Sequence, residues 1–237
     1  FSVLGVILLW FGWFGFNAGS TLAVTNKIPL IVLNTCLAAI FSGLSAISFQ
    51  YRIKKTIDAE AAINGVLGGL VAITAGCHFM MPLETIFIAI IAGILVVIGE
   101  RELEKYKIDD AINVVPVHLF CGIWGTLALS LFVDGQSLSS NLDFIQQFLI
   151  QLLGVIVIGL YAFSISYYGL KLINKFHPLR VSLRDETVGL NVSEHGASTE
   201  TLELFNEMVK HSEKGDFSTQ VNVEPFTEAG QIATQYN

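Results

Sequence analysis

The sequence predicts an all-α integral membrane protein, built as a bundle of six transmembrane helices followed by a cytosolic tail. Hydrophobic residues make up 53% of the 237 residues and charged residues only 14%, with a mean hydropathy of +0.63. The apolar residues form runs that are long enough to cross a hydrocarbon core of about 30 Å. After about Lys171 the composition becomes polar, which indicates a segment outside the bilayer.

Six apolar runs define the expected helices. None has the basic start and small-residue cleavage site of a secretory signal peptide. The first run begins at Phe1 without an initiator Met, so we expect further helices upstream of it. Small residues such as Gly65 and Gly69 recur, and they allow transmembrane backbones to pack closely. The runs cover residues 1–24, 30–50, 61–79, 83–99, 111–133 and 143–172.

The distribution of positive charge predicts the orientation. The connections at 78–84 and 134–143 contain no Lys or Arg, and the connection at 25–29 contains only Lys27. The other Lys and Arg residues follow the second, fourth and sixth runs. Because cytoplasmic loops carry an excess of Lys and Arg, we expect a multi-pass protein of the cell inner (plasma) membrane with a cytoplasmic C-terminus.

A histidine lies inside the fifth run, which carries no formal charge. If this helix starts at Asp110, His118 lies eight residues further on, roughly 12 Å along the axis and near the middle of the bilayer. A titratable side chain there needs a polar partner or a water-filled path. The residue types alone leave two interpretations open, a packing hydrogen bond or a place in such a path. Pro116 predicts a kink in the helix two residues before His118.

The first run places aromatic and polar side chains on one helix face. Trp13, Phe16, Asn17 and Ser20 follow the spacing i, i+3, i+4 and i+7. An aromatic stripe alone is typical of core packing or lipid contact. Asn and Ser must find polar partners in lipid, however, and aromatic faces attract cations. The face is therefore also a candidate lining for the path of a small cation.

Other functional classes are disfavoured by the residues. Cys36, Cys77 and Cys121 lie in apolar runs without CxxC spacing, which argues against a disulfide framework or a zinc site. The helices offer His118 no second titratable partner, and there is no HExxH pattern, so we predict that this chain is not an enzyme. We expect no metal, no cofactor and no nucleic-acid partner.

Four motifs occur in order along the chain: Trp13–Ser20, Gly65–Cys77, Asp109–Gly125 and Gly189–Gly196. Together they resemble the ammonium transporter (Amt/Mep/Rh) family. The resemblance implies a half of an inverted-repeat eleven-helix fold, namely helices six to eleven with a cytosolic tail motif, at residues 1–196. It also implies homotrimers with one pore per subunit, and partners such as ammonium or ammonia, the lipid bilayer and a P-II-type regulatory protein.

The resemblance also assigns roles to individual residues. Phe16 matches one of two phenyl rings stacked above the pore, and His118 matches the second of two pore histidines. Ser20 and Trp13 match the outer ammonium recruitment site. Asp110 is expected to cap the helix that carries His118.

Three further positions of the resemblance concern the surroundings of the pore. Asn17 is expected to be a structural residue near the pore. The chain departs from the common pattern at Asn113, where many members have Asp, and at Pro116, where Gly is common. These departures leave the matched pore residues unchanged.

Residues 197–237 resemble an incomplete HAMP-type signalling linker. The pattern predicts a helix at 200–210 with an apolar stripe, a break at Lys214-Gly215-Asp216, an extended connector at 217–223 and a second helix from Thr227. One such stripe cannot bury itself, so we expect association between chains. The alternative is an ordinary amphipathic tail. The stripe consists of Leu202, Phe205, Met208 and Val209.

The combined expectation is ammonium or ammonia transport through a narrow hydrophobic pore, in which a pore histidine handles the proton. The C-terminal linker would couple transport to ammonium sensing. The alternative is an ammonium receptor that conducts little and controls a downstream histidine kinase or diguanylate cyclase domain.

Overall fold

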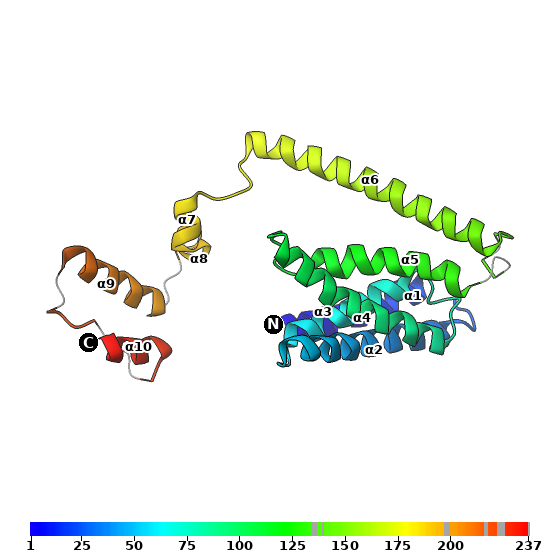
Figure 1. The fold of residues 1–237 in the computed structure, drawn as a ribbon, viewed down its shortest axis with the longest axis horizontal. Coiled ribbons are helices and arrows are strands. Elements are labelled where there is room, and N and C mark those ends of the chain that lie inside the picture. Colours follow the sequence, from blue (N-terminus) through cyan, green and yellow to red (C-terminus); the bar gives the residue numbers. More distant parts are fainter. Residues whose placement is uncertain (134–136, 139, 197–199, 216–217, 222–225, 237) are drawn as a thin grey trace. The chain divides into compact units, whose positions relative to one another are not determined.

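A computed structural model describes residues 1–133, 137–138, 140–196, 200–215, 218–221 and 226–236, and all regular elements in these ranges are helices (Figure 1). The prediction of an all-α fold is therefore confirmed. The elements in chain order are α1 (Ser2–Gly19), α2 (Ile28–Lys54), α3 (Ala59–Thr74), α4 (Pro82–Lys105), η1 (Val115–Phe120), α5 (Cys121–Phe132), α6 (Phe144–Phe176), α7 (Leu183–Val188), α8 (Leu190–Ser193), α9 (Glu200–Lys214) and α10 (Glu228–Tyr236).

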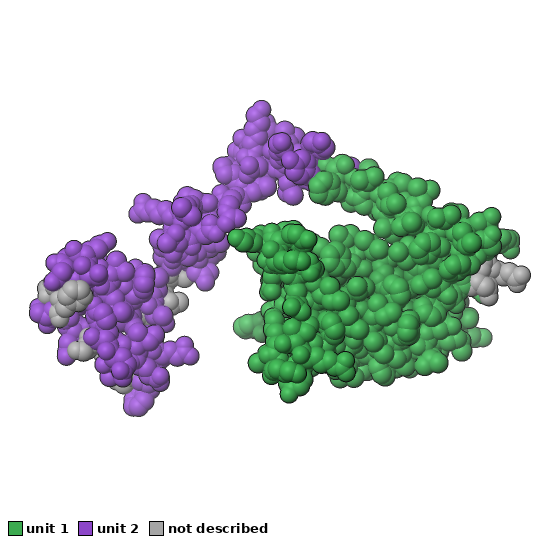
Figure 2. All heavy atoms as spheres, viewed as in Figure 1, with its two compact units in different colours: residues 1–164 green, residues 165–237 purple. Residues whose placement is uncertain are grey.

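Packing divides the chain into two compact units, residues 1–164 and residues 165–237 (Figure 2). The division falls inside α6, so it follows contacts and not the predicted domain boundary between residues 196 and 197. Residues 197–199 lie outside the described ranges. That domain boundary stays a prediction.

The first unit is a bundle in which α2, α3 and α4 pack against one another, with α1 and the η1–α5 segment laid against them (Figure 1). Close approach depends on glycine. A Cβ atom on Gly65 would lie 2.5 Å from the Cβ of Ala46, and one on Gly69 would clash with the carbonyl of Ala38. Small residues thus bring α2 and α3 into backbone contact, as is usual for helices that pack in a membrane.

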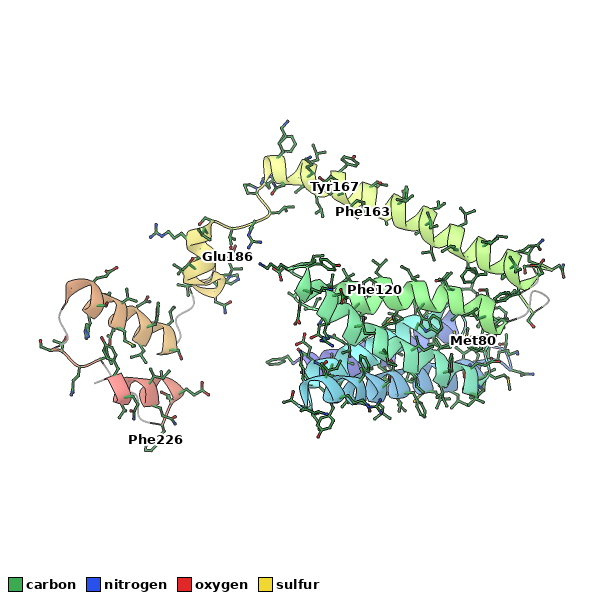
Figure 3. All side chains as sticks on the ribbon, viewed as in Figure 1. Met80, Phe120, Phe163, Tyr167, Glu186 and Phe226 are labelled. Carbon is green, nitrogen blue, oxygen red and sulfur yellow. The ribbon has the colours of Figure 1, made fainter. Side chains whose placement is uncertain are left out.

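Five of the described helical segments are long and apolar enough to cross a bilayer: α1, α2, α4, α6 and the combined η1–α5 segment. The expectation of a long third helix over 61–79 was wrong, because α3 ends at Thr74 after 16 residues. Residues 75–79 form turns instead. Asn34 holds this turn, since its buried side-chain amide donates to the carbonyls of Cys77 (3.1 Å) and Met80 (2.7 Å; Figure 3).

The last of these spanning segments, α6, differs from the others in burial. It runs for 33 residues, and Gln147 is its only buried side chain among the described residues. A helix that is apolar on all faces and exposed along its length is suited to contact with lipid or with another protein segment.

In the second unit, the predicted break and restart of the tail helices are both present. α9 ends at Lys214, and α10 begins at Glu228 after the Thr227 hydroxyl accepts a hydrogen bond from the N–H of Gly230 (2.9 Å). Asp216, Phe217 and residues 222–225 of the predicted extended connector lie outside the described ranges.

The apolar stripe of α9 was predicted only in part. Leu204, which the stripe did not include, is the buried residue of α9, and it packs with Val221, Ala229 and Ala233. Phe205 is 60% exposed. α10 thus covers Leu204 within the same chain, whereas Phe205 of the predicted stripe is left exposed, and the expected association between chains stays a prediction.

Candidate functional site

His118 lies in η1, a six-residue π-helix that leads directly into α5. The helix begins at Val115, so the expected start at Asp110 was wrong, and only about 5 Å of helix separates Val115 from His118. The cause is Asn113, which has a φ of 55° and interrupts the helical path before Val115. Pro116 lies in the first turn of η1, where its missing N–H is tolerated.

Asp110 binds the start of η1 from outside the helix. Its carboxylate oxygens accept hydrogen bonds from the backbone N–H groups of Val114 (2.9 Å) and Val115 (2.8 Å). Those N–H groups have no partner within the first turn of a helix, and a carboxylate also interacts favourably with the positive end of the helix dipole. Asp110 therefore acts as a cap, four to five residues before the backbone groups that it satisfies.

The His118 side chain is exposed and lines a cavity of about 510 Å³. The cavity lies between the N-terminal half of α1, the first turns of α3, and the segment from Ala111 to His118. Within the described residues the imidazole makes no hydrogen bond with another helix. Both interpretations of His118, a packing hydrogen bond and a place in a path, stay predictions. The apolar side chains that line the cavity include Val6, Leu9, Ile63, Leu67 and Val117.

Two residues of the predicted α1 face hold this helix to the bundle. The indole Nε1 of Trp13 donates to the hydroxyl of Thr74 (2.9 Å), and the amide of Asn17 donates to the hydroxyl of Thr35 (3.0 Å). Asn17 is 3% exposed. The N–H donors of Trp13 and Asn17 therefore find partners on α3 and α2, as polar groups in a membrane require.

The other two residues of the α1 face, Phe16 and Ser20, are exposed. Phe16 is 60% exposed and meets the Trp13 ring edge to face, with 6.2 Å between ring centroids. The exposed Ser20 hydroxyl donates to the carbonyl of Phe16 (2.6 Å). Phe16 lies seven residues beyond Leu9, the last α1 residue of the cavity, which is roughly 10 Å along the helix. Phe16 and Ser20 are thus separate from the cavity that contains His118.

The sequence interpretation missed two polar residues of this cavity, Glu60 and Asn64. Both lie on the first turns of α3, and Glu60 follows Asp58, whose side chain caps α3 by accepting from the Glu60 N–H (2.9 Å). The spacing of Glu60, Asn64 and Leu67 at i, i+4 and i+7 places them on one helix face. That spacing is the sequence feature from which Glu60 and Asn64 could have been identified.

Comparison with known proteins decides the family. A sequence model described as the Ammonium Transporter Family matches residues 1–200. The chain belongs to the ammonium transporter family. The resemblance drawn from the four motifs is thereby confirmed, and the family is one of transporters and not of enzymes.

Relatives of this ammonium transporter family chain include proteins of bacteria and archaea. It is 44% identical over 238 residues to the "Putative ammonium transporter sll0537" of Synechocystis, covering 100% of this chain and 44% of the relative. It is 37% identical to "Ammonium transporter Amt2" of Archaeoglobus fulgidus, covering 83% of this chain and 44% of the relative. The chain thus spans about half the length of the curated relatives it matches.

Solved structures agree with this family assignment. The structure named "Sensor Amt Protein" superposes with a TM-score of 0.77 at 40% identity, covering 81% of this chain and 48% of that one. Candida albicans Mep2 superposes with a TM-score of 0.70 at 24% identity, a likeness that concerns the fold alone. The half-fold predicted for the ammonium transporter family is therefore present in this chain.

Proposed function

We propose that the complete protein moves ammonium or ammonia across the membrane through a narrow apolar pore, and that His118 handles the proton. The observation that carries the proposal is the exposure of the His118 imidazole to a cavity of about 510 Å³ bounded mainly by apolar side chains. Membership of the ammonium transporter family supports the identity of the substrate.

The chemistry of imidazole suits the separation of ammonium from potassium. The two ions have the same charge and similar size, so a pore must use another difference. Imidazole offers a hydrogen-bond donor and an acceptor in one ring and can carry a proton near neutral pH. Ammonium can give up its proton and cross as a neutral molecule, whereas potassium must bear the full cost of losing its water in an apolar pore.

The α1 residues supply an outer entrance in this proposal. Phe16 acts as a ring that excludes bulk water, and Ser20 with Trp13 recruits the cation on the outer side. The exposure of Phe16 and Ser20 supports accessible roles, whereas Trp13 also contributes a structural hydrogen bond to Thr74. The separation of Phe16 from the cavity supports two successive positions of the transport path along α1.

The membrane arrangement follows from the exposed apolar helices. We propose a homotrimer in the inner (plasma) membrane, with its C-terminus in the cytoplasm. The uncovered apolar faces of α1 and α6 support contacts with lipid and with further protein segments. The distribution of Lys and Arg supports the cytoplasmic C-terminus.

A second candidate function is an ammonium receptor that conducts little and drives a downstream kinase or cyclase domain. The packing of α9 on α10 supports a structured linker and disfavours a passive tail. A solved neighbour bears the name "Sensor Amt Protein". A P-II-type regulatory protein or a fused signalling domain is the partner that this role requires.

Ammonium uptake by cells that lack their own transporters tests the proposal. The complete gene product should restore growth on low ammonium and accumulate labelled methylammonium, and the His118→Ala variant should not. A receptor would be present in the membrane at the same level but would restore neither growth nor accumulation. That result would replace the transport proposal with the receptor proposal.

A further inference from the structure

Glu60 joins the start of α3 to the turn that precedes His118. Its Oε1 atom accepts a hydrogen bond from the side-chain amide of Asn113 across 3.2 Å. The two residues are 53 positions apart in the sequence, so the bond connects two different elements. Glu60 also lines the cavity that contains His118.

Asn113 is the conformational centre of that turn. It is 7% exposed and has a left-handed φ of 55°, which costs energy for most residues other than Gly. Its N–H donates to the carbonyl of Asp110 (3.1 Å), and its carbonyl accepts from the N–H of Val117 (3.1 Å). The side-chain bond to Glu60 adds the contact to α3. The position of Val117, and hence of the adjacent His118, depends on the geometry at Asn113.

The rest of η1 is held from the opposite side. A Cβ atom on Gly99 of α4 would lie 2.9 Å from Pro116 and 2.7 Å from the Phe120 ring, so η1 packs tightly against α4 (Phe120 is labelled in Figure 3). On the cavity side, the hydrogen bond between Glu60 and Asn113 joins the turn before η1 to α3. His118 therefore lies on an element that packs against α4 and α3, and the turn before this element is hydrogen-bonded to α3 through Glu60.

The local charge explains why an amide suits position 113. A second cavity, of about 230 Å³, adjoins Glu60 and Asn113 and is lined mainly by carboxylates. An aspartate at 113 would face Glu60 without a proton to share, and nearby carboxylates would increase the repulsion. The neutral amide donates instead. The other carboxylates of this cavity are Glu100, Glu104, Asp109 and Asp110.

We infer that Glu60 is a positioning residue, which sets the orientation of His118 through its hydrogen bond with Asn113. The inference rests on the proposed role of His118 in the pore. Glu60 acts here as a hydrogen-bond acceptor, so its effect depends on the pairing with Asn113 and not on its negative charge alone. Exchanging donor and acceptor between the two positions should preserve the effect.

Four variants of the complete protein in membrane vesicles test this pairing. Glu60→Ala removes the acceptor, and Asn113→Asp opposes two carboxylates. Glu60→Gln keeps an acceptor for the Asn113 amide. The double variant Glu60→Gln with Asn113→Asp restores one donor and one acceptor with the direction of the hydrogen bond reversed. Glu102→Ala is the matched control, because Glu102 is an exposed carboxylate of α4 that forms an ion pair with Lys105 and lines neither cavity.

Two measurements are made on each variant: the rate at which diethyl pyrocarbonate modifies His118, read by mass spectrometry, and the maximum rate of labelled methylammonium uptake. We expect Glu60→Ala and Asn113→Asp to speed modification and to lower maximum uptake by about tenfold, the equivalent of one lost hydrogen bond in the orientation of the ring. Glu60→Gln, the double variant and Glu102→Ala should stay within about twofold of the original protein.

The double variant decides between positioning and simple loss of structure. If it is as impaired as Asn113→Asp alone in both measurements, or if Glu60→Ala changes neither, the positioning role is wrong. Absence of uptake by the original protein would instead reject the proposed transport function. The modification rates would still report the link between Glu60 and His118, so the two failures are distinguishable.

Discussion

The indole of Trp13 donates a hydrogen bond to the hydroxyl of Thr74 across 2.9 Å, which joins α1 to the last turn of α3. Thr74 is the residue at which α3 ends, and its hydroxyl in turn donates to the carbonyl of Leu70 (2.8 Å). A tryptophan on an aromatic stripe is usually interpreted as a lipid or pore contact. In this protein the indole N–H of Trp13 also makes a structural hydrogen bond, to Thr74.

We predict that Trp13→Phe lowers the stability of the purified protein by about 0.5–1.5 kcal/mol, because it removes this hydrogen bond and keeps an aromatic ring. Trp10→Phe is the matched control, since the Trp10 indole nitrogen is buried without a partner in the described part of the chain. Thermal unfolding in one detergent would compare the two. Equal destabilisation by both substitutions would show that ring size, and not the bond to Thr74, is responsible.

His118→Ala should lose either ammonium uptake or the discrimination against potassium, because the substitution removes the group that we propose handles the proton. Electrical recording in proteoliposomes of the complete protein, with ammonium and potassium tested in turn, measures both properties. His78→Ala is the control, since His78 lies in the turn region after α3 and outside the His118 cavity. Unchanged ammonium current together with unchanged potassium exclusion in His118→Ala would remove this residue from the mechanism.

Ser20→Ala and Phe16→Ala should have different effects. The Ser20 hydroxyl contributes one hydrogen bond, worth about 0.5–1.5 kcal/mol, so its loss should weaken the apparent affinity for ammonium by about tenfold at most. Phe16→Ala removes a ring that we propose excludes water, and it should alter conduction more than affinity. Uptake measured over a range of ammonium concentrations separates the two parameters. Complete loss of uptake in Ser20→Ala would contradict a recruitment role.

Parts of the fold that depend on local pattern were predictable from the sequence. The runs 30–50 and 83–99 correspond to α2 (Ile28–Lys54) and α4 (Pro82–Lys105). The helices extend beyond the runs because polar residues at the membrane surface continue the helical hydrogen bonding. The length of an apolar run identifies the part of a helix that lies in the membrane core, but it does not identify the residues at which the helix begins and ends.

Parts that depend on contacts between distant residues were not predictable. The helix that carries His118 starts late because Asn113 takes a left-handed conformation, and its bond to Glu60 comes from a residue 53 positions away. Leu204 is the buried residue of α9 because α10 covers it, whereas helical spacing alone favoured Phe205. Periodicity identifies faces of a helix, but the choice of the buried face is made by the partner element.

The tail offers a test of signalling that leaves the membrane unit unchanged. Val209 lies in the interior of α9, nine residues after the helix begins at Glu200 and five residues before it ends at Lys214. A proline there removes a backbone hydrogen bond and clashes with the preceding turn, at a cost of about 3 kcal/mol or more. We therefore expect Val209→Pro to abolish ammonium-dependent changes in the activity of a downstream domain and to leave ammonium uptake intact.

Thr201→Pro is the matched control, because it lies in the first turn of α9, where proline is tolerated. It should preserve both uptake and output. The measurement is autophosphorylation or cyclic nucleotide synthesis by the complete gene product, with and without ammonium, beside methylammonium uptake in the same membranes. If Val209→Pro and Thr201→Pro give the same output response, the continuity of α9 does not transmit the signal. A loss of uptake in Val209→Pro alone would instead show that α9 supports the pore, because a break confined to the tail then reaches the membrane unit.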